Sequence, residues 1–283
     1  MKETLKDNHE LIICPHCSCY VVINKADTQA TCKICGKAID VTEVISNEEN
    51  KTKEKMKIAG GLLVILEGGE GAGKTTQAKA LMDYYNSKGY NTKYFREPGG
   101  NKLAEDIRNM ILYNEMDTVT ETLLMNAARK INIDTNILPA LRDGCIVILD
   151  RFTKSTLVYQ GILNNGDLDF INECITEVTK DLLDDSYGYS IEFTLLCDPE
   201  VAVLRAAEDG HERNKYDEMA IDKYKKVNDA YCNLYRSNKL REYYFPITCM
   251  IDTTTLSLDD VFNRLVAGVD KLLESCDIIQ ELD

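Results

Sequence analysis

The sequence predicts an α/β protein, in which helices cover a parallel β-sheet, preceded by a small metal-binding segment. Two observations predict the sheet: apolar runs typical of buried strands alternate with longer segments of helical spacing, and one run leads into a glycine-rich loop. A third observation, two Cys-x2-Cys pairs near the amino terminus, predicts the metal-binding segment. The 283 residues suffice for one α/β domain and a small appendage.

Composition and charge narrow the class of protein. No segment approaches the roughly 18 consecutive apolar residues that a membrane helix needs, and the opening MKETLKDNHE lacks the apolar stretch of a signal peptide. A net charge of −14 argues against binding nucleic acid through a broad basic face. We therefore expect a cytoplasmic protein with no membrane contact and no nucleic-acid partner.

The amino-terminal segment, residues 1–46, is rich in cysteine. Five of the eleven cysteines lie within residues 14–35, and four of them form the pattern Cys-x2-Cys-x14-Cys-x2-Cys. Four thiolates on two tight turns give the closed tetrahedral site of structural Zn²⁺, so we expect a zinc ribbon. The expected ligands are Cys14, Cys17, Cys32 and Cys35, with His16 as a bystander and Cys19 as a bystander or competing ligand.

This zinc ribbon has two candidate roles, binding a protein partner or clasping a dimer. A segment so small builds little core, so metal binding should supply its folding energy. Residues 47–57, NEENKTKEKMK, are polar and lack apolar periodicity. We expect them to be a linker to the main domain, residues 58–283.

The main domain contains five apolar runs separated by helical segments. The expected strands are residues 62–66, 92–95, 145–149, 191–197 and 247–251. The helix after the first strand ends at Gly89, which suits a left-handed cap, and the last helix begins near Leu258. Strands alternating with helices in this way are typical of a parallel sheet.

The loop after the first strand, residues 68–75, fits the pattern G-x-x-x-x-G-K-[ST] between a strand and a helix. Its backbone N–H groups and the helix start attract phosphate oxygens, Lys74 reaches the transferred group, and the Thr75 hydroxyl coordinates Mg²⁺. The loop therefore predicts binding of ATP and Mg²⁺. The expected nucleotide contacts are Gly68, Glu70, Gly71, Ala72, Gly73, Lys74, Thr75 and Thr76.

Two further polar segments follow the ends of expected strands, where open α/β sheets bind ligands. REPGG begins at Arg96, and DRFTKSTLVYQG begins at Asp150. Arg96 and Arg151 are placed to clamp a second phosphate. Taken alone, either arginine is equally well explained as a surface ion pair.

Four motifs, in this order, carry a resemblance to a known family. They are EGGEGAGKTT from Glu67, REPGGN from Arg96, LLMNAAR from Leu123 and DRFTKSTLVYQG from Asp150. Together they resemble the thymidylate kinase family over residues 60–280. The resemblance implies the P-loop nucleoside monophosphate kinase fold, a homodimer, and ATP-dependent phosphorylation of a deoxypyrimidine 5′-monophosphate, dTMP.

The resemblance also implies a role for individual residues. Arg96 and Arg151 would hold the acceptor phosphate, Asp150 would lie near Mg²⁺, and Glu70 would face the deoxyribose 3′-hydroxyl. The implied contacts to the nucleoside are Arg129 with the base O4, Met125 with the ring, Ser155 and Thr156 at the substrate, and Tyr159 against C2′. A lid after residues 198–200 would offer Arg213, with Arg205 upstream, to the transferring phosphoryl group.

Three departures from the family pattern bear on the base. Met125 stands where the family has a Phe, Val158 where it usually has a smaller Ala, and Asn101 where it has a Thr. They leave a second acceptor open, dUMP or a 5-substituted deoxyuridylate. A reading from another class, a nucleotide-sensing scaffold without turnover, is opposed by the intact Lys74 and Arg151.

Overall fold

The computed structural model describes most of the chain: residues 9–13, 15–16, 20–24, 26–42, 55–182, 189–208, 221–236, 247–276 and 278–279. The chain divides into two compact units, Met1–Lys55 and Met56–Asp283. No helix among the described residues is long and apolar enough to cross a membrane.

The first unit consists of two small antiparallel pairs. Strands β1 (His9–Ile13) and β2 (Tyr20–Asn24) form one pair, and β3 (Gln29–Thr31) and β4 (Ala38–Asp40) form the other. Its small core contains Val21, Ile23, Cys32, Ile39 and Val41. So few apolar side chains provide little folding free energy, as the short sequence of this unit predicts.

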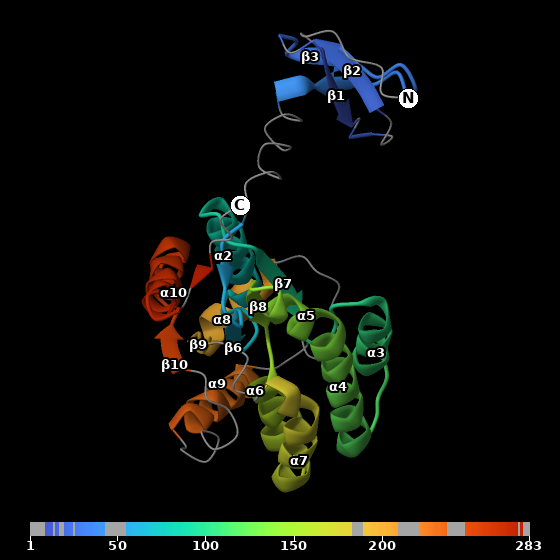
Figure 1. Cartoon of the computed structure of the whole chain (residues 1–283). Helices are drawn as coiled ribbons and strands as arrows, with labels where there is room; N and C mark the ends of the chain where they lie inside the picture. Colours follow the sequence, from blue (N-terminus) through green and yellow to red (C-terminus); the bar gives the residue numbers. More distant parts are fainter. Residues whose placement is uncertain are drawn as a thin grey trace. The chain divides into compact units, whose positions relative to one another are not determined.

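The second unit is built on a five-stranded parallel sheet, which confirms the predicted α/β fold (Figure 1). Its strands are β6 (Leu62–Gly68), β7 (Thr92–Arg96), β8 (Ile146–Asp150), β9 (Tyr189–Leu196) and β10 (Ile247–Asp252). They lie in the order β10-β9-β6-β8-β7. Because β8 and β9 flank β6 on opposite sides, the strand order switches at β6, and ligands bind outside the carboxyl ends of strands at such a point.

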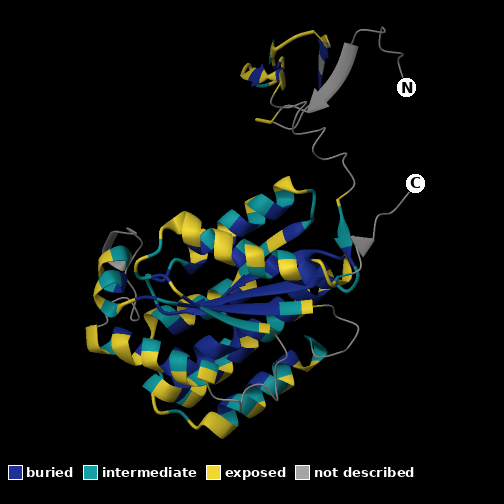
Figure 2. Cartoon of the chain, turned by 90° about the vertical axis from the view of Figure 1, so that its left-hand side faces the viewer, coloured by how far each residue is buried: buried dark blue, intermediate teal, exposed yellow. Residues whose placement is uncertain are grey.

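Helices cover both faces of this sheet, and their outward sides are exposed while the strands are buried (Figure 2). The helices of three turns or more are α2 (Lys74–Ser87), α3 (Lys102–Tyr113), α4 (Thr118–Asn132), α7 (Leu168–Thr179), α9 (Ile221–Arg236) and α10 (Leu258–Leu273). Shorter elements are β5 (Lys57–Ile58), η1 (Ile133–Ile137), α5 (Leu138–Arg142), α6 (Thr153–Thr156), η2 (Leu157–Leu163), η3 (Lys180–Leu182), α8 (Pro199–Glu208) and β11 (Ile278–Ile279).

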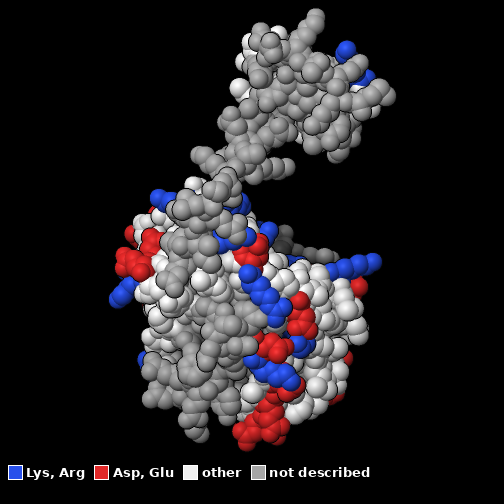
Figure 3. Space-filling model, in the orientation of Figure 1, with Lys and Arg blue, Asp and Glu red and all other residues white. Residues whose placement is uncertain are grey.

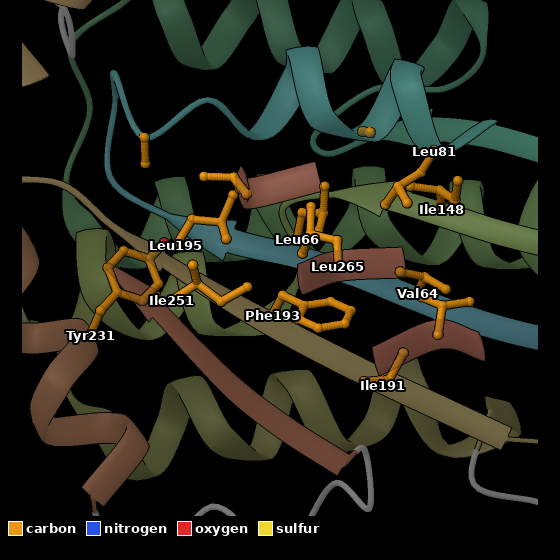
Figure 4. Packing of buried hydrophobic residues seen from close by; sticks show 14 of the residues in the cluster. Val64, Leu66, Leu81, Ile148, Ile191, Phe193, Leu195, Tyr231, Ile251 and Leu265 are labelled. Carbon is orange, nitrogen blue, oxygen red and sulfur yellow. The ribbon is translucent and has the colours of Figure 1, made fainter. Parts of the chain in front are cut away.

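The two faces of the sheet have different side chains. Along β6, Leu62, Val64 and Leu66 pack into the core with α2 and α10 (Figure 4). Leu63 and Ile65 pack into a second core with η1 and α5. Because side chains alternate along a strand, the next residue on this second face is Glu67, a carboxylate at the end of the strand.

Local sequence explains where several helices begin. Asn101, one of the departures from the family pattern, is the N-cap of α3, and its side chain accepts a hydrogen bond from the Ala104 N–H at 2.9 Å. Asn caps a helix at least as well as Thr, so this departure preserves the local structure. Ser257 and Asp260 form a reciprocal capping box at the start of α10.

Candidate active site

The glycine-rich loop passes so close to neighbouring backbone at two positions, Gly68 and Gly71, that a side chain is excluded there. Gly68 has φ +137°, and a Cβ there would lie 2.0 Å from the Leu195 carbonyl oxygen. Gly71 has φ +70°, and its Cβ would lie 2.3 Å from the Ala202 carbonyl oxygen. Helix α2 then starts at Lys74 without a side-chain cap, so its first N–H groups are available to an anion.

Lys74 lies inside this loop and is buried. Its ammonium group donates a hydrogen bond to the Gly69 carbonyl oxygen at 2.6 Å. Burial, and then repulsion by the Arg151 guanidinium, lowers the pKa of Lys74 to about 8. A phosphate placed in the loop would restore the charged form, because it supplies an opposite charge.

Thr75, in the first turn of α2, contacts Asp150, the last residue of β8. The Thr75 hydroxyl donates to Asp150 Oδ2 at 2.5 Å, and the Tyr94 hydroxyl approaches the same oxygen at 3.4 Å. A hydroxyl and a carboxylate beside a phosphate loop are the oxygen ligands that Mg²⁺ takes in such sites. These two residues therefore fit the predicted magnesium position.

Arg151 contacts both the loop and the segment that follows β8. Its Nη1 donates to the Gly68 carbonyl oxygen at 3.0 Å and to Ser155 Oγ at 3.2 Å, while Nη2 forms an ion pair with Glu70. The guanidinium also lies over the Tyr159 ring, 5.4 Å from its centroid. Arg151 itself has φ +71°, a left-handed conformation that is uncommon outside glycine and typical of functional sites.

Arg96 is held by a carboxylate as well. Its Nε and Nη2 atoms lie 3.3 and 2.8 Å from the two oxygens of Glu105, and Glu105 also accepts the Gly100 N–H at 3.2 Å. The sequence left open whether Arg96 binds a phosphate or forms a surface ion pair, and the structure shows an ion pair with Glu105. Its guanidinium is half exposed, so it is also accessible to a ligand.

A third arginine, Arg108 on α3, lies close to these two and was missed by the sequence analysis. Burial lowers the pKa of Arg108, and the charges of Arg96 and Arg151 lower it further. Its Nη1 donates to the Pro98 carbonyl oxygen at 3.1 Å. One signal was available: Arg108 lies four residues after the buried Ala104, and hence on the inward face of its helix.

Arg129 is almost fully buried in a polar network between α4 and the loop after β8. Its Nε pairs with Glu97 Oε2 at 2.8 Å, and Nη1 donates to Asn126 Oδ1 at 2.9 Å. Its Nη2 donates to Thr156 Oγ1 at 2.9 Å and to the Phe152 carbonyl oxygen at 3.1 Å. Burial raises the pKa of Glu97 against the opposing effect of Arg129.

The other residues predicted to contact a nucleoside lie on α4, near Arg129, and on α6 and η2, which follow β8. Met125 lies one turn before Arg129 on α4, half-buried, and Thr156 is bonded to the arginine directly. Tyr159 is buried on η2 beneath Arg151. The structure thus places Met125, Arg129, Thr156 and Tyr159 in one region, next to the arginines at the strand ends.

Arg213 lies outside the described residues, as do Cys14 and Cys17. Arg205 on α8 is described: its Nη2 donates to the carbonyl oxygens of Thr253 and Thr254 at 3.1 and 3.3 Å. Arg205 thus ties α8 to the loop after β10, and Thr253 ties that loop to the end of β9 by donating to the Leu196 carbonyl oxygen at 2.9 Å.

Cys32 and Cys35 lie on a tight turn between β3 and β4. The Gly36 N–H donates to the Cys32 carbonyl oxygen at 2.8 Å, and the Cys32 N–H donates to the Lys37 carbonyl oxygen at 2.9 Å. Within the part of the chain that the structure describes, no three His, Cys, Asp or Glu side chains are grouped so that they could hold a metal ion. Two of the four predicted ligands lie outside that part.

Comparison with known proteins agrees with this geometry. A sequence model of the thymidylate kinase family matches residues 66–253. The chain is 37% identical over 189 residues to a thymidylate kinase of Ligilactobacillus salivarius (strain UCC118), covering 64% of this chain and 87% of that relative. It is 37% identical over 175 residues to a thymidylate kinase of Bacillus thuringiensis (strain Al Hakam), covering 60% of this chain and 82% of the relative.

Proposed function

This chain belongs to the thymidylate kinase family and phosphorylates dTMP to dTDP with ATP, and from that premise we propose which residues serve each substrate. One observation carries the assignment: the Arg151 guanidinium, on the segment after β8, contacts Gly68 and Glu70 of the phosphate loop. A single cation would thus lie between the two phosphates that react. The acceptor is dTMP, and the retuned acceptors are not favoured because the relatives are thymidylate kinases.

On the donor side, the loop N–H groups and Lys74 would hold the ATP phosphates. Thr75 and Asp150 would hold Mg²⁺, which supplies charge neutralisation at the transferring group when bound. Phosphoryl transfer leaves the protein little covalent work, so these residues act by positioning and by stabilising charge. Arg213 is proposed to add positive charge from the lid, because the phosphate loop contains no arginine.

On the acceptor side, the phosphate of dTMP would bind to Arg96 and Arg151, with Arg108 beside them. Both Arg96 and Arg151 now pair with carboxylates, Glu105 and Glu70. The dianionic phosphate would replace these carboxylates, and Glu70 would then be free to accept from the 3′-hydroxyl. Tyr159, held under Arg151, would exclude a 2′-hydroxyl.

The base would lie against Met125 with its O4 toward Arg129. Arg129 is positioned on three sides by Glu97, Asn126 and Thr156, so its direction is fixed before the substrate binds. A guanidinium only donates hydrogen bonds, which suits the O4 of thymine and opposes the amino group of cytosine.

The acceptor assignment is tested by kcat/KM for dTMP, dUMP and dCMP measured side by side. We expect dTMP to be the best acceptor and dUMP to be used less well, since one methyl group in an apolar pocket gives about 10- to 200-fold discrimination. We expect dCMP to be rejected, because its amino group meets an arginine. Met125→Phe should shift the ratio further toward dTMP, and efficient phosphorylation of dCMP would contradict the role of Arg129.

The first unit is proposed to bind one structural Zn²⁺ through Cys14, Cys17, Cys32 and Cys35. The tight turn from Cys32 to Gly36 supports this, since zinc knuckles use turns of this kind. Ile34, on the same turn, is exposed, as a surface for a protein partner would require.

Protein purified without chelator is expected to contain one zinc per chain by elemental analysis. Cys32→Ser should lose the metal, because three ligands close the site poorly. Cys276→Ser is the matched control, a half-buried thiol in the second unit, and should keep it. Zinc-free native protein would refute the site.

A homodimer is proposed through the outer surfaces of α3 and α4, which pack side by side. Five large apolar residues there are each more than half exposed: Leu103, Met110, Tyr113, Val119 and Leu123. Clustered exposed apolar side chains mark interaction surfaces.

On the face in Figure 3, basic and acidic side chains lie next to one another and do not separate by sign. A cytoplasmic location is also proposed, in keeping with the free thiols of Cys174, Cys197, Cys232 and Cys249 among the described residues.

A further inference from the structure

Glu67, the last side chain of β6 before the phosphate loop, is a fully buried carboxylate. Burying a charge is costly unless hydrogen bonds compensate for the lost water. The residue lies on the face of the sheet that carries Leu63 and Ile65, opposite the α2 and α10 core. None of the proposed substrate contacts involves Glu67, so they do not explain why a carboxylate is buried at this position.

The two oxygens of Glu67 have different partners. Oε1 accepts two backbone N–H groups, those of Phe152 at 2.8 Å and Ser155 at 3.1 Å. Oε2 accepts two hydroxyls, Ser155 Oγ at 2.6 Å and Tyr231 at 3.1 Å. One carboxylate therefore holds the backbone of the segment after β8 with one oxygen and its side chain with the other.

Arg151 lies directly before this held segment. Its left-handed backbone, φ +71°, is unfavourable for a residue with a side chain and persists only where the surroundings fix it. The Phe152 N–H that Glu67 accepts is the next amide in the chain. At the end of its side chain, the Arg151 guanidinium donates to Ser155 Oγ at 3.2 Å. The Ser155 hydroxyl in turn donates to Glu67.

The contact with Tyr231 extends the network to another element. Tyr231 belongs to α9 and is fully buried, with its hydroxyl 2.9 Å from Ser155 Oγ and 3.1 Å from Glu67 Oε2. The three side chains lie within hydrogen-bond distance of one another, and their two hydroxyl protons fill two of the three contacts at a time. Because the hydroxyl of Ser155 is held by both neighbours, its orientation toward Arg151 is fixed.

We propose that Glu67 is a positioning residue for phosphoryl transfer, which acts by holding Arg151 through Phe152 and Ser155, with Tyr231 completing its shell. The inference rests on the role proposed above for Arg151. Glu67 touches neither substrate; it fixes the cation that does.

Glu67→Gln is the informative substitution. Its carbonyl oxygen can replace Oε1 and keep both backbone N–H bonds, so the protein should still fold. Its amide group then faces Ser155 and Tyr231 as a donor, and Ser155 can no longer donate there. We expect kcat/KM for dTMP to fall about tenfold, the scale of one hydrogen bond to a charged group, with the dissociation constant of ATP unchanged.

The decisive measurement is a double-mutant cycle with Arg151→Ala in the whole chain, followed by single-turnover kinetics. If Glu67 acts through Arg151, Glu67→Gln should cause no further loss once Arg151 is absent. An undiminished tenfold loss in the Arg151→Ala background would overturn the proposal, because it would show a general structural role. If Arg151→Ala alone keeps near-native turnover, the role of Arg151 fails first, and this inference fails with it.

Tyr231→Phe repeats the test with a milder change, since it removes one donor from Oε2 and keeps the carboxylate; it also serves if Glu67→Gln does not fold. Tyr85→Phe is the matched control. Tyr85 is another buried tyrosine whose hydroxyl donates to a carboxylate, Asp270 at 2.9 Å, but it lies on α2 and its partner on α10, outside the Glu67 network. We expect both variants to lose similar stability, and only Tyr231→Phe to lower kcat/KM for dTMP; equal kinetics in the two would overturn the proposal.

Discussion

Replacing Lys74 by Ala is expected to lower kcat roughly 100- to 1,000-fold, the usual effect of removing one preorganised charge from a transferring group. The ammonium lies within the glycine loop, 2.6 Å from the Gly69 carbonyl oxygen, and is shielded from water. The melting temperature should not fall, because burial disfavours the charged form of Lys74 in the folded protein. Steady-state kinetics and thermal unfolding of the same preparation measure both.

Lys79→Ala is the control for this variant. Lys79 is an exposed residue of the same helix and should leave kcat unchanged. Near-native turnover of Lys74→Ala would show that the loop binds phosphate without using this cation in the transition state.

In the unmodified protein, kcat/KM for ATP should decline as the pH rises through about 8, because Lys74 of the enzyme without bound ATP then loses its proton.

Replacing Arg151 by Ala is expected to lower kcat by a similar factor, roughly 100- to 1,000-fold, and to raise KM for dTMP as well. The second effect distinguishes it from Lys74→Ala. Arg151 would contact the acceptor phosphate in the ground state, whereas its bond to Gly68 brings the same charge next to the donor. Alanine has the same steric cost at this left-handed backbone position as arginine, so the variant removes the guanidinium without adding backbone strain.

Arg264→Ala, at an exposed position on α10, is the matched loss of one arginine far from the loop. It should change neither kcat nor KM. If Arg151→Ala raised KM for dTMP without lowering kcat, the guanidinium would bind the acceptor only, and its place between the two phosphates would have no catalytic meaning.

The fold was predictable from the sequence because its signals are local. Five apolar runs give the five strands, and the glycine pattern between the run ending at Leu66 and the helix from Lys74 gives the phosphate loop. The strand order was not predictable, since no local signal says that β8 inserts between β6 and β7. The zinc site and Arg213 stay predictions.

The residues of the site were predictable where they belong to a sequence motif. Their hydrogen-bond and ion-pair partners were less predictable, because these depend on how the elements pack together. Arg96 and Arg151 lie at the strand ends as expected, and Arg129 lies on α4, but the sequence did not show that Glu105 pairs with Arg96 and Glu97 with Arg129. Glu67 is the first residue of the motif EGGEGAGKTT, but the sequence predicted no function for it. Its function depends on Tyr231, 164 residues away along the chain, and no sequence spacing reveals such a contact.

The carboxylates paired with Arg96 and Arg151 have a consequence for selectivity among cellular anions. A small anion that binds these arginines must compete with Glu105 and Glu70, which are tethered beside them and so act at high effective concentration. Inorganic phosphate or sulfate would gain only the charge contacts that these carboxylates already provide. A nucleotide adds its base and sugar contacts, so the kinase should resist inhibition by the phosphate of its own cell.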